Sequence, residues 1–316
     1  MQPPPSEPRI CLLSQSAYFK SLPPPLPLSS SIASFNVNPQ TQSPLFGVLY
    51  PELRNLIFVF ALTAYDDRSR PYSKHSCYYR PGFEYPTRIA TDLLLSCRLI
   101  YLETHLAPVS LNEHAFCMER GPHNYIRDHT RYFEKMTVEQ RAAVKQVRFY
   151  TQLYWLEGRM KQEWPVGLSI PKLVITVRHS DWWFWENSEP LRIDDPDQWG
   201  AWVGSIPGLR ELEIEFETID AKKEELEERV RVALGWKFPL KDGACLIHNG
   251  EEPVKSTWLG SSYMSPDNYE YDDSDYSDDD IAAVDYEGSR DLKFSMTLVH
   301  HVRKFQFVVE SRVGAL

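Results

Sequence analysis

Residues 44–62 constrain the fold more than any other stretch, because there proline-broken sequence gives way to a helix-period apolar pattern. Apolar side chains recur every four residues and therefore share one face of an α-helix over about three turns. They are Leu49, Leu53, Ile57 and Ala61, and Leu56 and Phe60 widen the stripe. Pro51 suits the first turn of the helix, where a backbone N–H would have no intrahelical partner. The stretch therefore predicts an amphipathic helix.

Three segments share sequence features with one known module. ELRN at residues 52–55 lies in the predicted helix, LLSCRLIYLET occupies residues 94–104, and LNEHAF occupies residues 111–116. Together they resemble the F-box-like module of a large group of fungal proteins, over roughly residues 44–118. Two departures are present. Proline follows Leu49 by two places rather than one, and about thirty residues separate the two best-matched helices.

The resemblance implies docking on a Skp-type adaptor protein, which would deliver a second, client-binding domain to a cullin ubiquitin ligase. It also implies which side chains of the first helix make the contact. They are Leu49, Pro51, Leu53, Ile57 and Phe58. The client protein itself is not readable from the sequence.

Chain length and cysteine content limit the number of domains and the cellular compartment that we expect. At 316 residues the chain is long enough for two domains. Its five cysteines form no dense framework, so we expect reduced thiols in the cytoplasm or nucleus. No apolar run approaches the roughly 18–20 residues of a membrane span, and the first residues lack the apolar core of a secretory signal. We therefore expect no membrane partner.

The remainder of the chain divides by composition and pattern. Residues 1–43, rich in proline and serine, predict a disordered tail. Residues 119–316 alternate strand and helix patterns, which favours strands covered by helices. Ile-Pro-x-Leu occurs at residues 170–173 and 206–209 and resembles an edge of degenerate leucine-rich repeats. We expect a mixed α/β protein, with a helical F-box-like module at residues 44–118 followed by a leucine-rich-repeat-like α/β domain.

Period-two alternation predicts five strands, and helix-period patterns predict four further helices. The strands are expected at residues 146–150, 173–177, 212–216, 294–298 and 305–309. The helices are expected at residues 89–106, 196–204 and 221–234, with a fourth beginning at a capping box formed by Thr137 and Gln140. In the third strand, we expect the three apolar residues to face the core and Glu213 and Glu215 to face solvent.

The common nucleotide, metal and hydrolase motifs do not occur in the sequence, so we predict no catalytic residue, metal or cofactor. His75 and Cys77 have plausible metal-ligand spacing, but zinc requires four ligands. His300 and His301 alternate faces of a strand, so at most one is expected to point inward. The aromatic residues at 182–185 could fill a core or form a recognition surface, and both interpretations stay open.

Three hypotheses on function follow. The leading one is a non-catalytic adaptor, the substrate-recognition subunit of a Skp–cullin–F-box ubiquitin ligase. The alternative is a stand-alone scaffold whose first helix only caps the repeat core. An enzyme on an unfamiliar template is the third, and a clustered, buried set of titratable residues would favour it. An exposed apolar face on the first helix favours the adaptor, whereas a face buried under residues 146–310 favours the cap.

Residues 265–289 predict a disordered acidic insertion. Ten acidic residues and no Lys or Arg lie between Asp267 and Glu287. The net charge of −10 is therefore concentrated there, and the rest of the chain lacks the basic excess expected of a nucleic-acid binder. Ser277, which precedes three aspartates, is a candidate phosphorylation site for an acid-directed kinase.

Replacing residues 266–287 with a short Gly/Ser linker is expected to leave the melting temperature nearly unchanged. Ordering each residue costs roughly 1–2 kcal/mol, which so few apolar side chains cannot offset. A longer surface loop adds little closure entropy. Differential scanning calorimetry of the two proteins provides the measurement. A large drop in melting temperature would mean that the segment packs on the body of the protein.

Overall fold

The computed structural model describes residues 36–261 and 297–310, apart from positions 75, 119, 123–125, 127, 161 and 162, together with Ser29 and Ile32. Most of the predicted tail, the whole acidic insertion and Ser277 lie outside the described residues. The predictions made for these segments therefore stay predictions.

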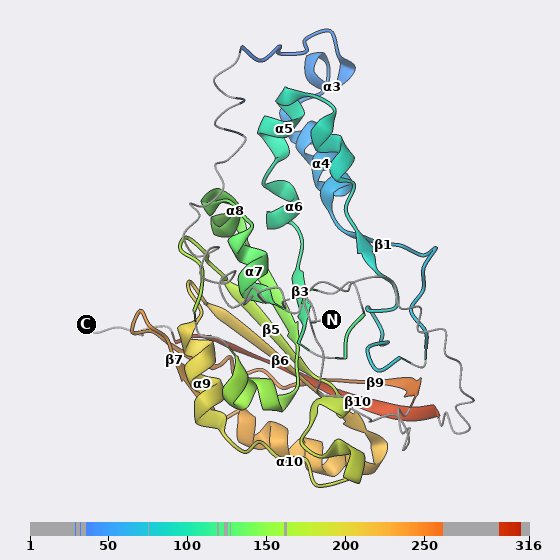
Figure 1. The fold of residues 1–316 in the computed structure, drawn as a ribbon, viewed down its shortest axis with the longest axis vertical. Helices are drawn as coiled ribbons and strands as arrows, with labels where there is room; N and C mark the ends of the chain where they lie inside the picture. Colours follow the sequence, from blue (N-terminus) through green and yellow to red (C-terminus); the bar gives the residue numbers. More distant parts are fainter. Residues whose placement is uncertain are drawn as a thin grey trace, which may run out of the picture.

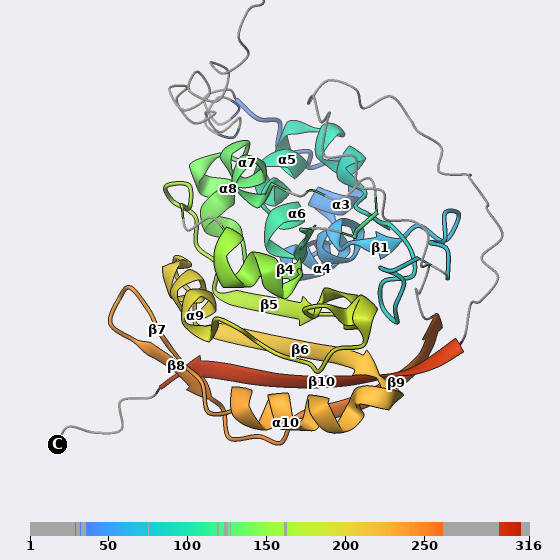
Figure 2. The same ribbon diagram turned by 60° about the horizontal axis from the view of Figure 1, so that its bottom comes forward.

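The described chain is a mixed α/β protein built on an eight-stranded sheet, in the order β3-β4-β5-β6-β10-β8-β7 with β9 also paired to β10 (Figures 1 and 2). Strands β3 to β6 are parallel to one another. Strands β6, β8 and β9 each pair with β10 in the antiparallel sense, and β7 pairs with β8 in the same sense. The strands are β3 (His114–Cys117), β4 (Gln146–Tyr150), β5 (Lys172–Val177), β6 (Glu211–Ile219), β7 (Lys237–Pro239), β8 (Cys245–His248), β9 (Val254–Ser261) and β10 (Thr297–Val309). A separate two-stranded pair joins β1 (Tyr65–Asp66) and β2 (Thr87–Arg88).

Short helices surround the sheet (Figure 1). The α-helices are α3 (Pro44–Gly47), α4 (Pro51–Leu62), α5 (Arg98–Thr104), α6 (Ala107–Ser110), α7 (His129–Glu134), α8 (Val138–Ala143), α9 (Pro196–Ser205) and α10 (Lys223–Ala233). Other helical turns are η2 (Thr91–Leu95), η3 (Trp155–Arg159), η4 (His179–Asp181), η5 (Trp185–Asn187) and η6 (Asp220–Lys222). Figure 1 places α3–α6 at one end of the molecule and α9 and α10 at the other.

The main hydrophobic core lies between one face of the sheet and the helices α7, α9 and α10. Phe133, Trp199 and Leu226 come from these three helices, and each is fully buried. The inward side chains of the strands alternate as the sequence predicts. They include Val147, Phe149, Leu173, Ile175, Leu212, Ile214 and Phe216, all of them fully buried. The predicted strands at residues 146–150, 173–177 and 212–216 are therefore confirmed.

The core-filling interpretation of the tryptophans is confirmed for most of them. Trp182, Trp185 and Trp202 are buried like Trp199, and the indole N–H of Trp182 donates to the backbone oxygen of Glu217 at 2.9 Å. Phe184 is the exception in its cluster, because it is exposed. Aromatic area therefore stabilises the core rather than forming a continuous surface.

Several predicted elements differ in detail. Residues 305–309 are the end of one long strand, β10, whose described part begins at Thr297, so the predicted break after residue 298 is wrong. The capping box is confirmed, because Gln140 N–H donates to Thr137 Oγ1 at 3.1 Å. The single helix predicted at residues 89–106 is wrong. It is split at Cys97, whose extended backbone and thiol cap the start of α5.

The opposite face of the sheet, which we call the charged face, carries Arg148, Thr176, Glu213, Glu215 and Glu217. The prediction that Glu213 and Glu215 face solvent is wrong, because they are only 3% and 9% exposed. Lys304 lies 2.6 Å from Glu213, and Arg148 lies 3.1 Å from Glu215. The carboxylates are buried because cations from other elements neutralise them.

The loop between β1 and β2, residues 67–86, covers part of the charged face. Arg80 from this loop lies 3.3 Å from Glu215 and 3.7 Å from Glu217. Phe83 packs against Tyr150 at the end of β4, with ring centroids 5.0 Å apart. The stretch that separates the two best-matched helices in sequence is therefore bound to the sheet.

Glu217 is the most strongly perturbed carboxylate of the charged face. Burial alone would raise its pKa, but the Arg80 charge, together with contacts from His300 and Trp258, lowers the pKa to about 2. Its ionised form therefore contributes stability above its ordinary pKa near 4.5, and this contribution is lost as the pH falls toward about 2.

Glu217→Gln is expected to lower the free energy of unfolding at pH 7 by about 3–5 kcal/mol, because it leaves a buried ion pair without one partner. The difference from the parent protein should shrink as the pH falls below about 4.5. Urea denaturation at pH 7, 5 and 3 measures it. Glu228→Gln, at an exposed ion pair with Arg231, is the control and should change stability by less than about 1 kcal/mol. A pH-independent difference for Glu217→Gln would contradict this account.

Candidate docking surface

The three segments that carry the family resemblance contact one another in space. Arg54 of α4 makes two hydrogen bonds with Glu103 of α5, Nε to Oε2 at 3.0 Å and Nη2 to Oε1 at 3.2 Å. The same guanidinium lies over the Phe46 ring, 4.9 Å from its centroid. This paired geometry fixes α4 against α5, although the two helices are far apart in sequence.

Asn112, from the third segment, holds the carboxyl end of α4. Its side-chain amide donates to the backbone oxygens of Leu62 and Pro108, at 2.9 and 2.8 Å. Its side-chain oxygen accepts from the Ala64 N–H at 2.6 Å. One buried side chain thus joins the last residue of α4, the backbone two residues beyond it and α6. The segment continues directly into β3, so the helical module and the sheet share residues 114–117.

The contacts of α4 bury only one side of the helix. Phe58 and Leu62 are 3% and 0% exposed and face inward. The other side carries an apolar stripe at i, i+3, i+4 and i+7, which is one helix face. Its members are Leu53, Leu56, Ile57 and Phe60, with exposed fractions of 48%, 53%, 45% and 79%. We call these four residues the α4 stripe.

Other apolar side chains lie exposed close to the α4 stripe in sequence or within the same module. They are Val48, Tyr50, Val59 and Leu95. Covering the four stripe residues, which are now 45–79% exposed, would contribute about 3–7 kcal/mol, since full burial of one such side chain contributes about 1.5–3 kcal/mol. Apolar surface of this extent on one helix is typical of a protein-interaction site.

The predicted docking residues differ in their exposure in the structure. Leu53 and Ile57 lie in the α4 stripe, Pro51 is exposed at the first turn, and Leu49 is half-buried. Phe58 is in the interior and unavailable to a partner in this arrangement. Leu56 and Phe60 were not among the predicted contacts. Their spacing of three and seven residues from Leu53 is the sequence signal that places them on the same face.

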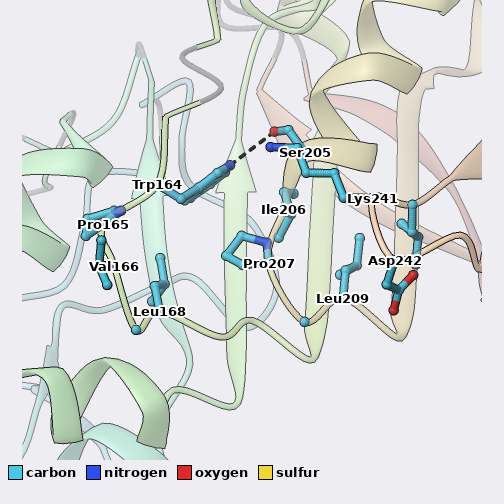
Figure 3. Close-up of a pocket in the computed structure, with 13 residues that line it drawn as sticks. Trp164, Pro165, Val166, Leu168, Ser205, Ile206, Pro207, Leu209, Lys241 and Asp242 are labelled. Atoms are coloured by element: carbon cyan, nitrogen blue, oxygen red, sulfur yellow. Dashed lines mark hydrogen bonds between the residues drawn. The ribbon is translucent and has the colours of Figure 1, made fainter.

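A cavity lies elsewhere, at the amino ends of β5 and β6 (Figure 3). It has a volume of about 380 Å³. Figure 3 shows Trp164 at one side, where its indole N–H donates to Ser205 Oγ at 3.1 Å, and Asp242 at the other. The two Ile-Pro-x-Leu turns meet here, because Ile170 N–H donates to the Pro207 oxygen at 2.8 Å. The lining is mainly apolar and holds no cluster of titratable groups.

Metal-ligating side chains do not gather within the described residues, where no group of three or more His, Cys, Asp or Glu could hold an ion. His114 is hydrogen-bonded at both ring nitrogens, to Tyr132 and to the Val109 oxygen, each at 2.9 Å. His75, which has metal-ligand spacing to Cys77 in the sequence, lies outside the described residues. No helix in the described part of the chain is long and apolar enough to cross a bilayer.

Comparison of the chain with protein-family models, with curated proteins and with solved structures gives no match.

Asn112→Ala is expected to lower the free energy of unfolding by about 2–3 kcal/mol, because it leaves buried backbone groups without hydrogen-bond partners. Chemical denaturation followed by circular dichroism provides the measurement. Asn55→Ala is the matched control, since Asn55 is exposed on α4 and should change stability by less than about 0.5 kcal/mol. Equal effects of the two substitutions would mean that Asn112 does not hold the end of α4.

Proposed function

We propose that this protein is a non-catalytic interaction adaptor, in which the α4 stripe docks on a Skp-type adaptor protein of a cullin ubiquitin ligase. The observation that carries the proposal is the exposure of Leu53, Leu56, Ile57 and Phe60 on a helix whose opposite side is packed. Burial of this exposed apolar helix face against a partner would lower the free energy of the complex.

The family resemblance supports the choice of partner. The segments that resemble an F-box-like module are joined by the Arg54–Glu103 ion pair and by the hydrogen bonds of Asn112. In this arrangement the α4 stripe faces outward. Arg54, Glu103 and Asn112 thus hold the helix from its packed side, whereas the side chains of the α4 stripe remain free for contact. An adaptor of this kind would act in the cytoplasm or nucleus.

The alternative, a scaffold whose first helix caps the repeat core, is less well supported. A cap would place the apolar stripe of α4 under residues 146–310. The packed side of α4 instead carries Phe58 and Leu62, and the helix contacts α3 and α6. The four stripe residues themselves are 45–79% exposed.

A clustered, buried set of titratable groups does occur on the charged face, so the enzyme hypothesis has to be weighed. A general base works best when its pKa lies near the working pH. Against the effect of burial, the Arg80 charge and the contacts from His300 and Trp258 lower the pKa of Glu217 to about 2, and burial lowers the pKa of His179 to about 4. Both groups are therefore poorly matched to proton transfer at neutral pH, which favours a structural or binding role.

We place client recognition in the α/β domain, whose parallel strands β3–β6 alternate with helices as in a degenerate leucine-rich-repeat array. The side-by-side Ile-Pro-x-Leu turns before β5 and β6 support this interpretation, since equivalent turns of successive repeats stack in this way. The client is a protein of unassigned identity.

Leu53→Glu combined with Ile57→Glu is expected to abolish binding of a purified Skp-type adaptor, because two buried, unpaired carboxylates would replace apolar contact. The loss in affinity should exceed 100-fold, measured by isothermal titration calorimetry. Val232→Glu is the control variant, since Val232 is 50% exposed on α10, distant from α4 in the fold. It should bind like the parent protein.

Circular dichroism should show that the double variant stays folded, because both side chains already face solvent. Equal adaptor binding by the parent and double variant, or no binding by the parent, would contradict the proposal.

A further inference from the structure

We propose that a small cavity at the carboxyl ends of β5 and β6 binds an uncharged amide group of a ligand. The cavity is lined by residues of the β1–β2 loop, of the segment following β5, and of strands β6, β9 and β10, with a volume of about 30 Å³. Carboxyl ends of parallel strands are the usual place for ligand sites in open α/β sheets. This inference is independent of adaptor docking on α4.

Three residues that line the cavity have polar atoms without hydrogen-bond partners in the described chain. They are Nη1 of Arg80, Nε1 of Trp185 and Nε2 of His300, whose other ring nitrogen, Nδ1, lies 3.4 Å from Oε1 of Glu217. The residues are only 8%, 6% and 5% exposed, so bulk water does not solvate them. Orphaned buried donors are rare in native folds and indicate a partner that occupies the site. The concentration of three such residues around one cavity carries the proposal.

The unsatisfied groups specify hydrogen-bonding chemistry. Arg80 Nη1 and Trp185 Nε1 can only donate, so the ligand must present an acceptor oxygen. The Glu217 carboxylate oxygen beside Nδ1 of His300 can only accept, so Nδ1 directs its proton there, and Nε2 of an uncharged ring is then an acceptor. An amide supplies both an acceptor oxygen and N–H donors, so it can satisfy all three residues together.

The charges around the cavity argue against a charged ligand. Each carboxylate near it already has a guanidinium partner. Glu217 lies near Arg80, Asp181 lies 2.6 Å from Arg178, and Glu186 lies 3.2 Å from Arg120. A bound carboxylate or ammonium would bring an unpaired charge into a site whose ion pairs are complete, which is costly. An uncharged amide avoids this cost.

Size and shape agree with a planar group of a few atoms. A cavity of about 30 Å³ admits the end of a side chain or a small molecule, but not a nucleotide or sugar. Flat aromatic walls surround it, because Trp258 stacks on His300 with ring centroids 4.3 Å apart and planes 19° apart. The cavity is reachable, since Tyr79, His179 and Trp258 are only half-buried.

The test uses the indole N–H signals of the full-length protein in 1H–15N spectra. Acetamide should shift the Trp185 indole signal in a saturable way. The Trp155 indole, which is also buried without a partner but lies outside the cavity, should not move. Acetate and methylammonium, tested at equal concentration, should leave both signals in place. An unchanged Trp185 signal with acetamide would mean that the cavity holds only water, and a stronger response to acetate would mean that it is an anion site. Either result overturns the proposal.

Trp185→Phe removes the N–H while keeping an aromatic ring. Followed at the Trp258 indole, it should weaken acetamide binding about 3- to 10-fold, the effect of one lost hydrogen bond. Trp155→Phe is the matched control and should leave the affinity unchanged. Equal affinities of parent protein and Trp185→Phe would overturn the assignment of Trp185 as a donor to the ligand.

The amide could belong to a free small molecule or to a glutamine side chain of a protein. A Gly-Gln-Gly peptide and a Gly-Glu-Gly peptide distinguish these sources. Tighter binding of the glutamine peptide than of acetamide would assign the site to protein recognition, and equal or weaker binding would assign it to a free amide. Preference for the glutamate peptide would overturn the proposal.

Discussion

The burial of three carboxylates on one strand is the constraint on which much of this structure depends. Glu213, Glu215 and Glu217 alternate with the apolar residues of β6, so packing both faces of the sheet necessarily buries them. Each buried carboxylate requires a cation within ion-pair distance, since an isolated charge in the interior is costly. Lys304 arrives from β10 and Arg80 from the β1–β2 loop. The neighbours of β6 and the position of the loop are therefore specified by charge as well as by apolar packing.

This requirement gives the stretch between α4 and η2 a structural purpose. Arg80 lies 135 residues from Glu215 in sequence, and its contact ties the helical module to the middle of the sheet. The module is anchored by its loop and by β3, while Asn112 holds the end of α4. Because these anchors act on the inward side of the helix, the α4 stripe needs no contact with the body of the protein and remains exposed.

Apolar alternation was sufficient to predict the core strands, helix periodicity to predict α4, and the capping box of Thr137 and Gln140 to predict the start of α8. They could not predict the burial of Glu213 and Glu215, because a polar residue in a strand has the same pattern whether it faces solvent or a cation contributed by a distant segment. The same limit applies to the docking surface. An apolar helix face has the same sequence pattern whether it packs on the core or on a partner. The sequence therefore could not tell that the face with Phe58 is inward and the face with Phe60 is outward. The break at Cys97 was missed because a thiol cap is a weak sequence signal.

The described part of the chain contains an exposed apolar surface and a group of buried donors without hydrogen-bond partners, and each requires a different kind of ligand. The α4 stripe is apolar and exposed, so only a surface of similar extent can remove it from water. The cavity beside Arg80 contains buried donors, each of which costs about 1–3 kcal/mol while unpaired. Arg80 cannot turn away to find water, because Glu215 and Glu217 hold the same guanidinium through Nη2. The ion pairs that secure the loop therefore also fix a donor in the cavity, so that stability of the charged face and readiness to bind a ligand arise from one side chain.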